Sequence, residues 1–156
     1  MQLCPGLKVK KKWLEAMRGV HGPVKSTEVR KYLPYRKFRP KGSEVYIGQR
    51  ICLVACGEVW GSARLLSVDT YTLETLAADP EHRLDAFEGA AEEASARLLA
   101  GETLYAWRLR DFHWFPEDCR PLSGSNGVPE FCGQRHGQVW TSQDLPCGRE
   151  PEMNAV

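Results

Sequence analysis

Alternating hydrophobic and polar positions along the chain predict four β-strands. Apolar side chains recur at every second residue, or in short uninterrupted runs, over residues 25–30, 50–56, 59–68 and 103–115. Gly57 and Glu58 separate the second and third segments and suit a tight turn, so we expect these two segments to form a hairpin. Pro116 ends the fourth segment, which is rich in aromatic residues. We therefore expect four strands of one sheet.

An apolar spacing of three or four residues predicts two helical regions. Residues 10–19 form a short helix that a glycine can end, and residues 80–100 are expected to be mainly helical. The second region carries its apolar stripe at Leu84, Phe87, Ala91, Ala94 and Leu98. Periodicity then fades, and Gly, Pro and Ser become frequent. Residues 7–116 are thus expected to form the domain, and residues 117–156 an irregular C-terminal extension with a frayed end.

Length and composition narrow the class of protein. A chain of 156 residues suggests one domain, and 42% hydrophobic with 26% charged residues excludes a mostly disordered, collagen-like or coiled-coil chain. No segment approaches the roughly 18–20 consecutive apolar residues of a membrane span, so we expect no membrane contact. Residues 1–14 lack the apolar core of a secretory signal. We therefore expect an intracellular protein, cytoplasmic or nuclear.

The charge is distributed unevenly. Residues 1–50 hold 13 Lys or Arg and 3 Asp or Glu, whereas the remainder of the chain is acidic. Such a basic region attracts anions, most commonly nucleic acid; the alternative is a solvated basic surface. Between Arg30 and Lys41, cations alternate with aromatic rings, as in loops that follow phosphates and stack bases. The candidate nucleic-acid residues of this loop are Tyr32, Tyr35, Arg36, Lys37, Arg39 and Lys41. A solvated loop with its aromatics tucked inward is the alternative.

The six cysteines are not spaced as zinc ligands, so we expect no metal and no other cofactor. Cys52 and Cys56 belong to one predicted strand and are four residues apart, which places them on the same face. We expect both to be buried and reduced, as small hydrophobic residues of the core.

The segment KSTEVR, residues 25–30, carries the most specific chemistry. Lys25 and Arg30 supply two cations and Glu28 a carboxylate, a set that suits a base edge or a phosphate. Ser26 faces the same side as Glu28, and Trp107 in the last strand is the aromatic best placed to stack a base. The alternative is a surface ion pair between Glu28 and Arg30, with the aromatic residues in the core.

Three stretches in this order resemble the ASCH domain of the PUA-like superfamily. They are residues 13–30 (a helix, a glycine-containing turn and KSTEVR), residues 48–65 (GQRICLV and WGSARL) and residues 104–116 (LYAWRL ahead of Phe112, Phe115 and Pro116). The resemblance spans about residues 7–116. It implies an α+β fold, a small PUA-like β-barrel with packed helices, and a cleft beside residues 25–30 that is associated with RNA.

A bacterial branch of that family hydrolyses the acyl group of acetylated cytidine, and this chain resembles it at Lys25. The branch has a threonine where this sequence has Glu28, and Thr27 is one residue out of register, which reverses its face. Its second carboxylate would correspond to Glu81 or Glu88. Ser26 remains a conceivable nucleophile.

We therefore predict a module that recognises RNA or a modified nucleotide in a cleft beside residues 25–30, acting as a monomer. Two alternatives stay open. The chain could be a small hydrolase acting on an acylated nucleoside or RNA, or a protein-interaction domain that uses its acidic helix.

Overall fold

The computed structural model describes residues 6–20, 22–34, 45–78, 87, 89–122 and 152–153. Its strands form one sheet in the order β1-β3-β4-β5-β2, with β6 pairing with β5. They are β1 (Gly6–Lys8), β2 (Thr27–Arg30), β3 (Arg50–Ala55), β4 (Glu58–Tyr71), β5 (Leu104–Trp114) and β6 (Glu152–Met153). β1 runs parallel to β3, and the other pairs are antiparallel. All four predicted strands are present.

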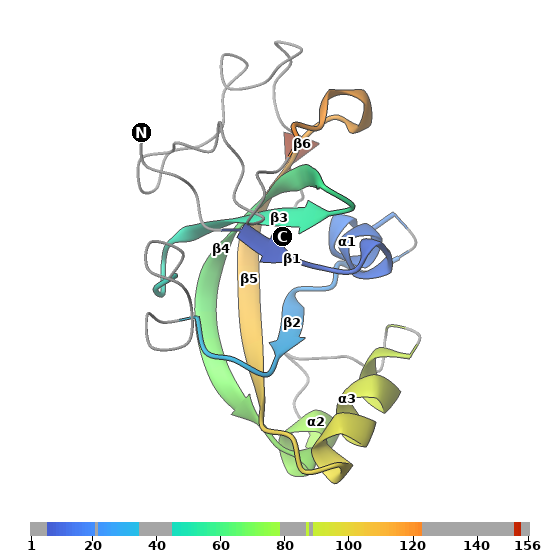
Figure 1. Ribbon diagram of the computed structural model, residues 1–156, viewed down its shortest axis with the longest axis vertical. Helices are drawn as coiled ribbons and strands as arrows, with labels where there is room; N and C mark the ends of the chain where they lie inside the picture. The colour runs from blue at the N-terminus through green and yellow to red at the C-terminus, as the bar shows by residue number, and fades with distance from the viewer. Residues whose placement is uncertain are drawn as a thin grey trace.

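The sheet is curled into a half-barrel (Figure 1). Register shifts interrupt the β4–β5 ladder twice and the β3–β4 ladder once, and such bulges increase the local twist of a strand. The curl brings the two edge strands near each other, since Arg30 Nη1 on β2 donates a hydrogen bond of 2.8 Å to the Lys8 carbonyl on β1. Among the described residues these edges share this side-chain contact and no backbone ladder. The fold is α+β, as predicted.

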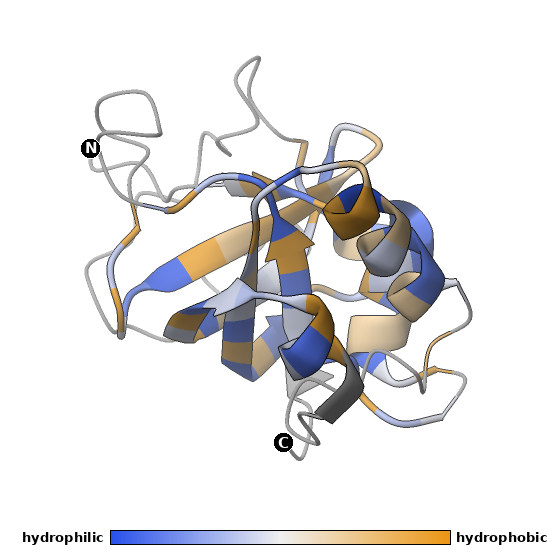
Figure 2. Ribbon diagram, turned by 90° about the horizontal axis from the view of Figure 1, so that it is seen from below, coloured by the Kyte–Doolittle hydropathy of each residue, from blue (hydrophilic) through white to orange (hydrophobic). Residues whose placement is uncertain are grey.

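The main core lies against one face of this sheet. Strand positions alternate between hydrophobic and hydrophilic (Figure 2), and the largest fully buried side chains include Trp107, Phe112 and Trp114 of β5. Gly61 allows β4 to approach β5 closely, because a Cβ atom there would lie 2.1 Å from the His113 carbonyl oxygen. The β3–β4 hairpin and the adjacent strand β5 therefore form one tightly packed unit.

Three α-helices accompany the sheet in the described part of the chain: α1 (Lys11–Arg18), α2 (Leu73–Ala78) and α3 (Ala90–Leu99). Helix α1 buries Trp13, Leu14 and Met17, and ends at Gly19, whose φ of 77° suits glycine. Helix α3 confirms the later part of the predicted helical region, whereas residues 79–86 lie outside the described residues. None of the described helices is long and apolar enough to cross a membrane.

The prediction for the cysteines is wrong in two respects. Cys52 is buried as expected, but it is disulfide-bonded, and so is Cys119. Cys56 is an exposed free thiol, because β3 already ends at Ala55 and Cys56 enters the turn with a φ of 53°. The alternation of the strand stops there, so Cys56 does not share the buried face of Cys52.

A second, smaller core covers the other face of β3. It consists of Cys52, Val54, Val59, Phe115 and Cys119. Of the predicted extension, the structure describes residues 117–122 and 152–153, where Glu58 bridges Leu122 and β6 pairs with His113 and Trp114. The division into a domain and an extension stays a prediction.

Candidate functional site

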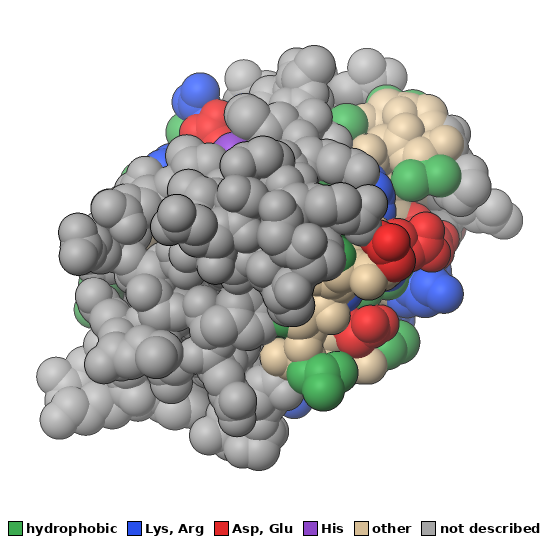
Figure 3. All heavy atoms as spheres, turned by 90° about the horizontal axis from the view of Figure 1, so that it is seen from above, with side chains coloured by type: hydrophobic (Ala, Val, Ile, Leu, Met, Phe, Trp, Pro, Cys, Tyr) green, Lys and Arg blue, Asp and Glu red, His purple; other side chains and the backbone are tan. Residues whose placement is uncertain are grey.

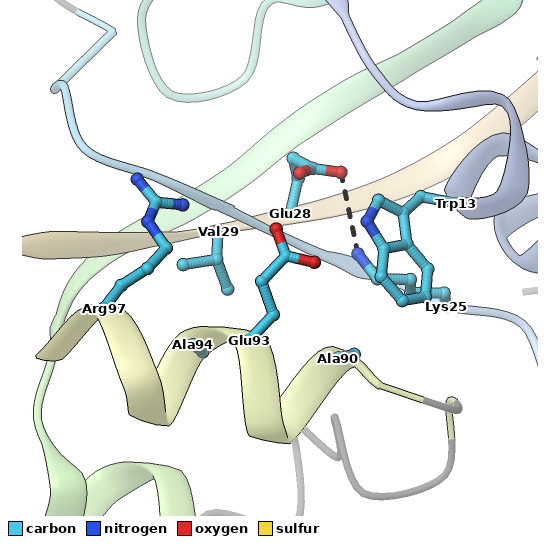
Figure 4. A pocket seen from close by; sticks show the side chains of 8 residues that line it. All are labelled: Trp13, Lys25, Glu28, Val29, Ala90, Glu93, Ala94 and Arg97. Atoms are coloured by element: carbon cyan, nitrogen blue, oxygen red, sulfur yellow. Dashed lines mark ion pairs between the residues drawn. The ribbon is translucent and has the colours of Figure 1, made fainter. Parts of the chain in front are cut away.

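A small pocket opens between β2, α1 and α3 (Figure 4). Its empty space amounts to about 320 Å³, a figure that includes space open to solvent. Its lining residues are Trp13 from α1, Lys25, Glu28 and Val29 from β2 and the residues leading into it, and Ala90, Glu93, Ala94 and Arg97 from α3. Lys25 and Glu28 were predicted as site residues, and the structure brings them together here.

Backbone hydrogen bonds fix the segment that carries both residues. The Lys25 amide donates to the Ala16 carbonyl at 3.0 Å, which ties the start of the segment to the end of α1. The Leu109 amide donates to the Ser26 carbonyl at 2.7 Å, and Glu28 then pairs with Trp107 in the β2–β5 ladder. The side chains of Lys25 and Glu28 therefore start from an ordered backbone.

Lys25 and Glu28 form a buried ion pair. Lys25 Nζ lies 3.6 Å from Glu28 Oε2, and the two side chains are 3% and 8% exposed. The ammonium group also donates to the Thr27 carbonyl and lies 5.4 Å from the ring centroid of Trp13. Figure 4 shows the lysine extending past the indole toward the carboxylate. Desolvation by burial lowers the pKa of Lys25, and the charge of Glu28 opposes this shift.

Glu28 retains unused hydrogen-bonding capacity. Its Oε2 atom is buried and has no hydrogen-bond partner in the described part of the chain, because 3.6 Å to Lys25 Nζ exceeds a hydrogen bond. A buried acceptor of this kind is costly to leave unmet. A ligand with an N–H or O–H group in the pocket would supply the missing donor.

Charges of both signs balance around the pocket. Glu93 reaches from α3 into the same space and pairs with Lys10 at 3.2 Å, while Arg97 pairs with Glu102 at 2.9 Å. The lining thus has two cations and two carboxylates. A balanced lining favours an uncharged polar ligand over a phosphate.

The remaining predicted ligand residues lie elsewhere. Ser26 is half-buried and Arg30 is held by the Lys8 carbonyl; neither lines the pocket. Trp107 is 1% exposed within the core, where its Nε1 donates to the Tyr32 carbonyl at 3.1 Å. The indole predicted to stack a base is therefore packed against protein.

Of the six candidate nucleic-acid residues of the loop, Tyr32 alone lies within the described residues. Its side chain is exposed, and Lys31 Nζ lies 5.2 Å from the centroid of its ring. Tyr35, Arg36, Lys37, Arg39 and Lys41 lie outside the described residues, as do Glu81 and Glu88.

Sequence analysis missed three polar or aromatic residues of the pocket: Trp13, Glu93 and Arg97. Trp13 belongs to the apolar stripe of α1, together with Leu14 and Met17, a pattern that is typical of core residues. Glu93 and Arg97 are four residues apart and so share one helix face, a signal that was available. The sequence contains no sign that this face meets β2. In the described part of the chain, no cluster of three metal-ligating side chains occurs.

No protein-family model and no curated protein matches the sequence. Similar solved structures are ASCH proteins of Zymomonas mobilis. One is titled ASCH, with 19% identity and a TM-score of 0.48, covering 68% of this chain and 66% of that one. A point variant has 18% identity and a TM-score of 0.49, covering 72% and 75%. At this level of similarity these structures say nothing of ligand or activity.

Proposed function

We propose that this protein is an ASCH-like module that recognises RNA or a nucleotide by holding one base in the pocket beside residues 25–30. The observation that carries the proposal is the buried Lys25–Glu28 pair, with its unmet acceptor at Glu28 Oε2. In the same proposal the curled sheet is the wall of a small PUA-like β-barrel. The contact between Arg30 and Lys8 across its edges supports this.

The Lys25–Glu28 pair suits the edge of a nucleobase. A base edge presents amino or imino donors beside carbonyl or ring-nitrogen acceptors, so a carboxylate and an ammonium group side by side complement it. Trp13, Ala90 and Ala94 supply apolar walls for the flat ring. The balanced charge of the lining supports a base in the pocket, with the phosphates outside it.

The exposed phosphates of an RNA strand would then meet the basic loop. This loop begins where β2 ends at Arg30, so it starts next to the strand that carries Glu28. Salt steeply weakens the binding that arises from contacts between cations and phosphates, whereas it has little effect on hydrogen bonds to a base. The proposal thus divides binding into a salt-resistant part in the pocket and a salt-sensitive part in the loop.

The test is binding of short single-stranded RNA and of free nucleosides, measured by fluorescence anisotropy and calorimetry. Glu28→Gln keeps the size of the side chain and removes the carboxylate, and we expect it to weaken binding about tenfold. Glu92→Gln, at an exposed position on α3 outside the pocket, is the matched control and should bind as the wild type does. Equal affinities of the two variants would refute the proposed role of the pocket.

One observation favours a second function, hydrolysis of an acylated nucleoside or RNA. Burial lowers the pKa of Lys25, and an amine of lowered pKa beside carboxylates can transfer protons. The pocket supplies Glu93 as a second carboxylate near Lys25. Release of free acid from an acylated nucleoside by the wild type, and its loss in Lys25→Met, would establish this activity. Binding of the nucleoside without hydrolysis would mean that the protein binds this ligand and does not hydrolyse it.

A further inference from the structure

A second polar cluster lies where β3, β4 and β5 run side by side. Its members, which we call the Arg50 cluster, are Arg50, Ser62, Arg64, Arg110, Asp111 and His113. The ladder places Arg50 beside Arg64, Arg64 beside Arg110, and Ser62 beside His113. None of these residues lines the pocket described above. Arg50 alternates with the core residue Ile51, so the cluster belongs to the sheet face that Cys52 shares.

Exposure in the cluster increases from its base to its rim. Ser62, His113 and Arg50 are 0%, 3% and 7% exposed. The side chains of Arg64, Asp111 and Arg110 are 26%, 41% and 54% exposed. Figure 3 shows basic, acidic and histidine side chains together at one margin of the face seen from above. The cluster thus has a buried polar base and a rim that solvent reaches.

The buried base has side-chain nitrogens without hydrogen-bond partners in the described part of the chain. Arg50 Nη1 donates to Ser62 Oγ at 3.0 Å and to the Asp111 carbonyl at 2.9 Å. Arg50 Nε and His113 Nδ1 are buried without a hydrogen-bond partner in the described part of the chain. Nε and Nη2 form the side of the guanidinium fork that can hold two oxygens of one oxyanion. On that side, Nε is the nitrogen that has no hydrogen-bond partner in the described part of the chain.

Positive charge also exceeds negative charge here. Asp111 is the one carboxylate of the cluster, and its Oδ2 lies 3.5 Å from Arg64 Nε and 3.7 Å from Arg110 Nε. Arg50 makes no ion pair within the described part of the chain. Burial is the main cause that lowers the pKa of Arg50 to about 10; the neighbouring Arg64 acts in the same direction, and the charge of Asp111 opposes them. Arg50 is therefore still a cation at neutral pH, and a buried cation without a counter-ion is costly.

A backbone irregularity holds Arg50 in this arrangement. Between Ser62 and Arg64 the ladder to β5 shifts register, so that Asp111 and Phe112 both lie opposite Ala63. Asp111 adopts a φ of 53°, which is unusual for a residue other than glycine. Its carbonyl accepts one hydrogen bond from Arg50. Bulges of this kind often re-aim groups beside a binding site.

We propose that the Arg50 cluster binds one phosphate-type oxyanion. The Nε–Nη2 side of Arg50 donates to two of its oxygens, and His113 donates from Nδ1. Arg64 and Arg110 at the rim supply the attraction that draws the anion in. This site is separate from the pocket and does not depend on a base being bound there.

Titration of the folded protein with inorganic phosphate in chloride buffer tests the site. We expect the imidazole resonances of His113, assigned by their loss in His113→Gln, to shift in a saturable manner. Arg64→Gln should weaken phosphate binding about tenfold. Arg18→Gln is the control, because Arg18 on α1 is also half-buried and belongs neither to the Arg50 cluster nor to the pocket. It should bind phosphate as the wild type does.

Two further arms make the outcome specific. Arg50→Lys keeps the charge and loses the fork, so we expect it to bind phosphate more weakly than the wild type does. Without phosphate, the His113 resonances of this variant should lie where they lie in the wild type, which shows that the fold is intact. A dinucleotide that contributes one phosphodiester should compete with phosphate if the anion belongs to RNA, and should fail to compete if the site takes free phosphate. Unchanged His113 resonances throughout the titration, or equal losses in Arg64→Gln and Arg18→Gln, would overturn the proposal.

Discussion

Lys25 and Glu28 depend on each other for their contribution to the free energy of unfolding. Both side chains are almost fully removed from solvent, so either one alone would be an uncompensated buried charge. We expect Glu28→Ala to destabilise the fold by about 3 kcal/mol or more. The double variant Lys25→Met, Glu28→Leu should lose much less, because no charge remains. Urea unfolding of the two single variants and the double variant measures this coupling, and additive losses would contradict it.

His113 gives the stability of the protein a pH dependence of known sign. Burial is the main cause of its lowered pKa, Arg50 and Arg64 act in the same direction, and Asp111 opposes them. Below the unfolded value of 6.5 the unfolded chain therefore binds a proton before the folded chain does. Stability contributed by the neutral imidazole is present above that value and is lost as the pH falls through the folded pKa.

We therefore expect the free energy of unfolding to decrease as the pH is lowered from 7.5 toward 5.5. His113→Gln should show a smaller decrease over the same interval, because its side chain does not titrate. Urea unfolding at several pH values makes the comparison. Parallel curves for the two proteins would show that other groups cause the decrease.

At the scale of elements, the close approach of β4 and β5 depends on Gly61. An added Cβ would lie 2.1 Å from the His113 carbonyl oxygen and 2.9 Å from the Trp114 Cα, and neither backbone atom can move aside alone. Gly61→Ala should cost about 3 kcal/mol or more. Gly57→Ala is the control: its Cβ meets open space, and the φ of 75° predicts a cost of about 1 kcal/mol. Thermal unfolding of both variants tests the difference.

Strands with a clear alternation of hydrophobic and polar residues were predictable from the sequence. Strands whose bounds depend on pairing with a segment distant in sequence were less predictable. The alternation in residues 50–56 and 103–115 identified β3 and β5 to within one or two residues. β4 runs to Tyr71, beyond the predicted residue 68, because its ladder with β5 continues through Thr70 and Tyr71. β1 spans three residues, too few to show a period, and exists because β3 offers a free edge beside it.

The candidate site shows the same division. Lys25 and Glu28 were identified because both lie in one short segment of the sequence, KSTEVR. Glu93 and Arg97 come from a helix more than sixty residues away, and only folding places that helix over β2. Trp107 was predicted to stack on a base of the ligand. Side chains alternate between the two faces of β5, and Trp107 lies on a face that is buried in the core.

At the scale of the whole molecule, the disulfide-bonded Cys52 and Cys119 bear on where the protein works. Disulfides persist mainly in oxidising compartments, which disagrees with the intracellular location expected from the sequence. We expect thiol titration in denaturant without reductant to find fewer than six thiols, and Cys56 to react in the folded protein. Six reactive thiols would mean that the cysteines are reduced and that the intracellular expectation stands.

In the proposed function, the pocket holds an uncharged base between Lys25, Glu28 and the walls from α1 and α3. The side-chain nitrogen and Cε resonances of Lys25, assigned by their loss in Lys25→Met, report on this pocket directly. During titration with unphosphorylated nucleosides, we predict that they shift saturably and by similar amounts at low and high salt. Lys25 resonances that stay unchanged with nucleosides, or that respond to phosphate-bearing ligands alone, would contradict the account.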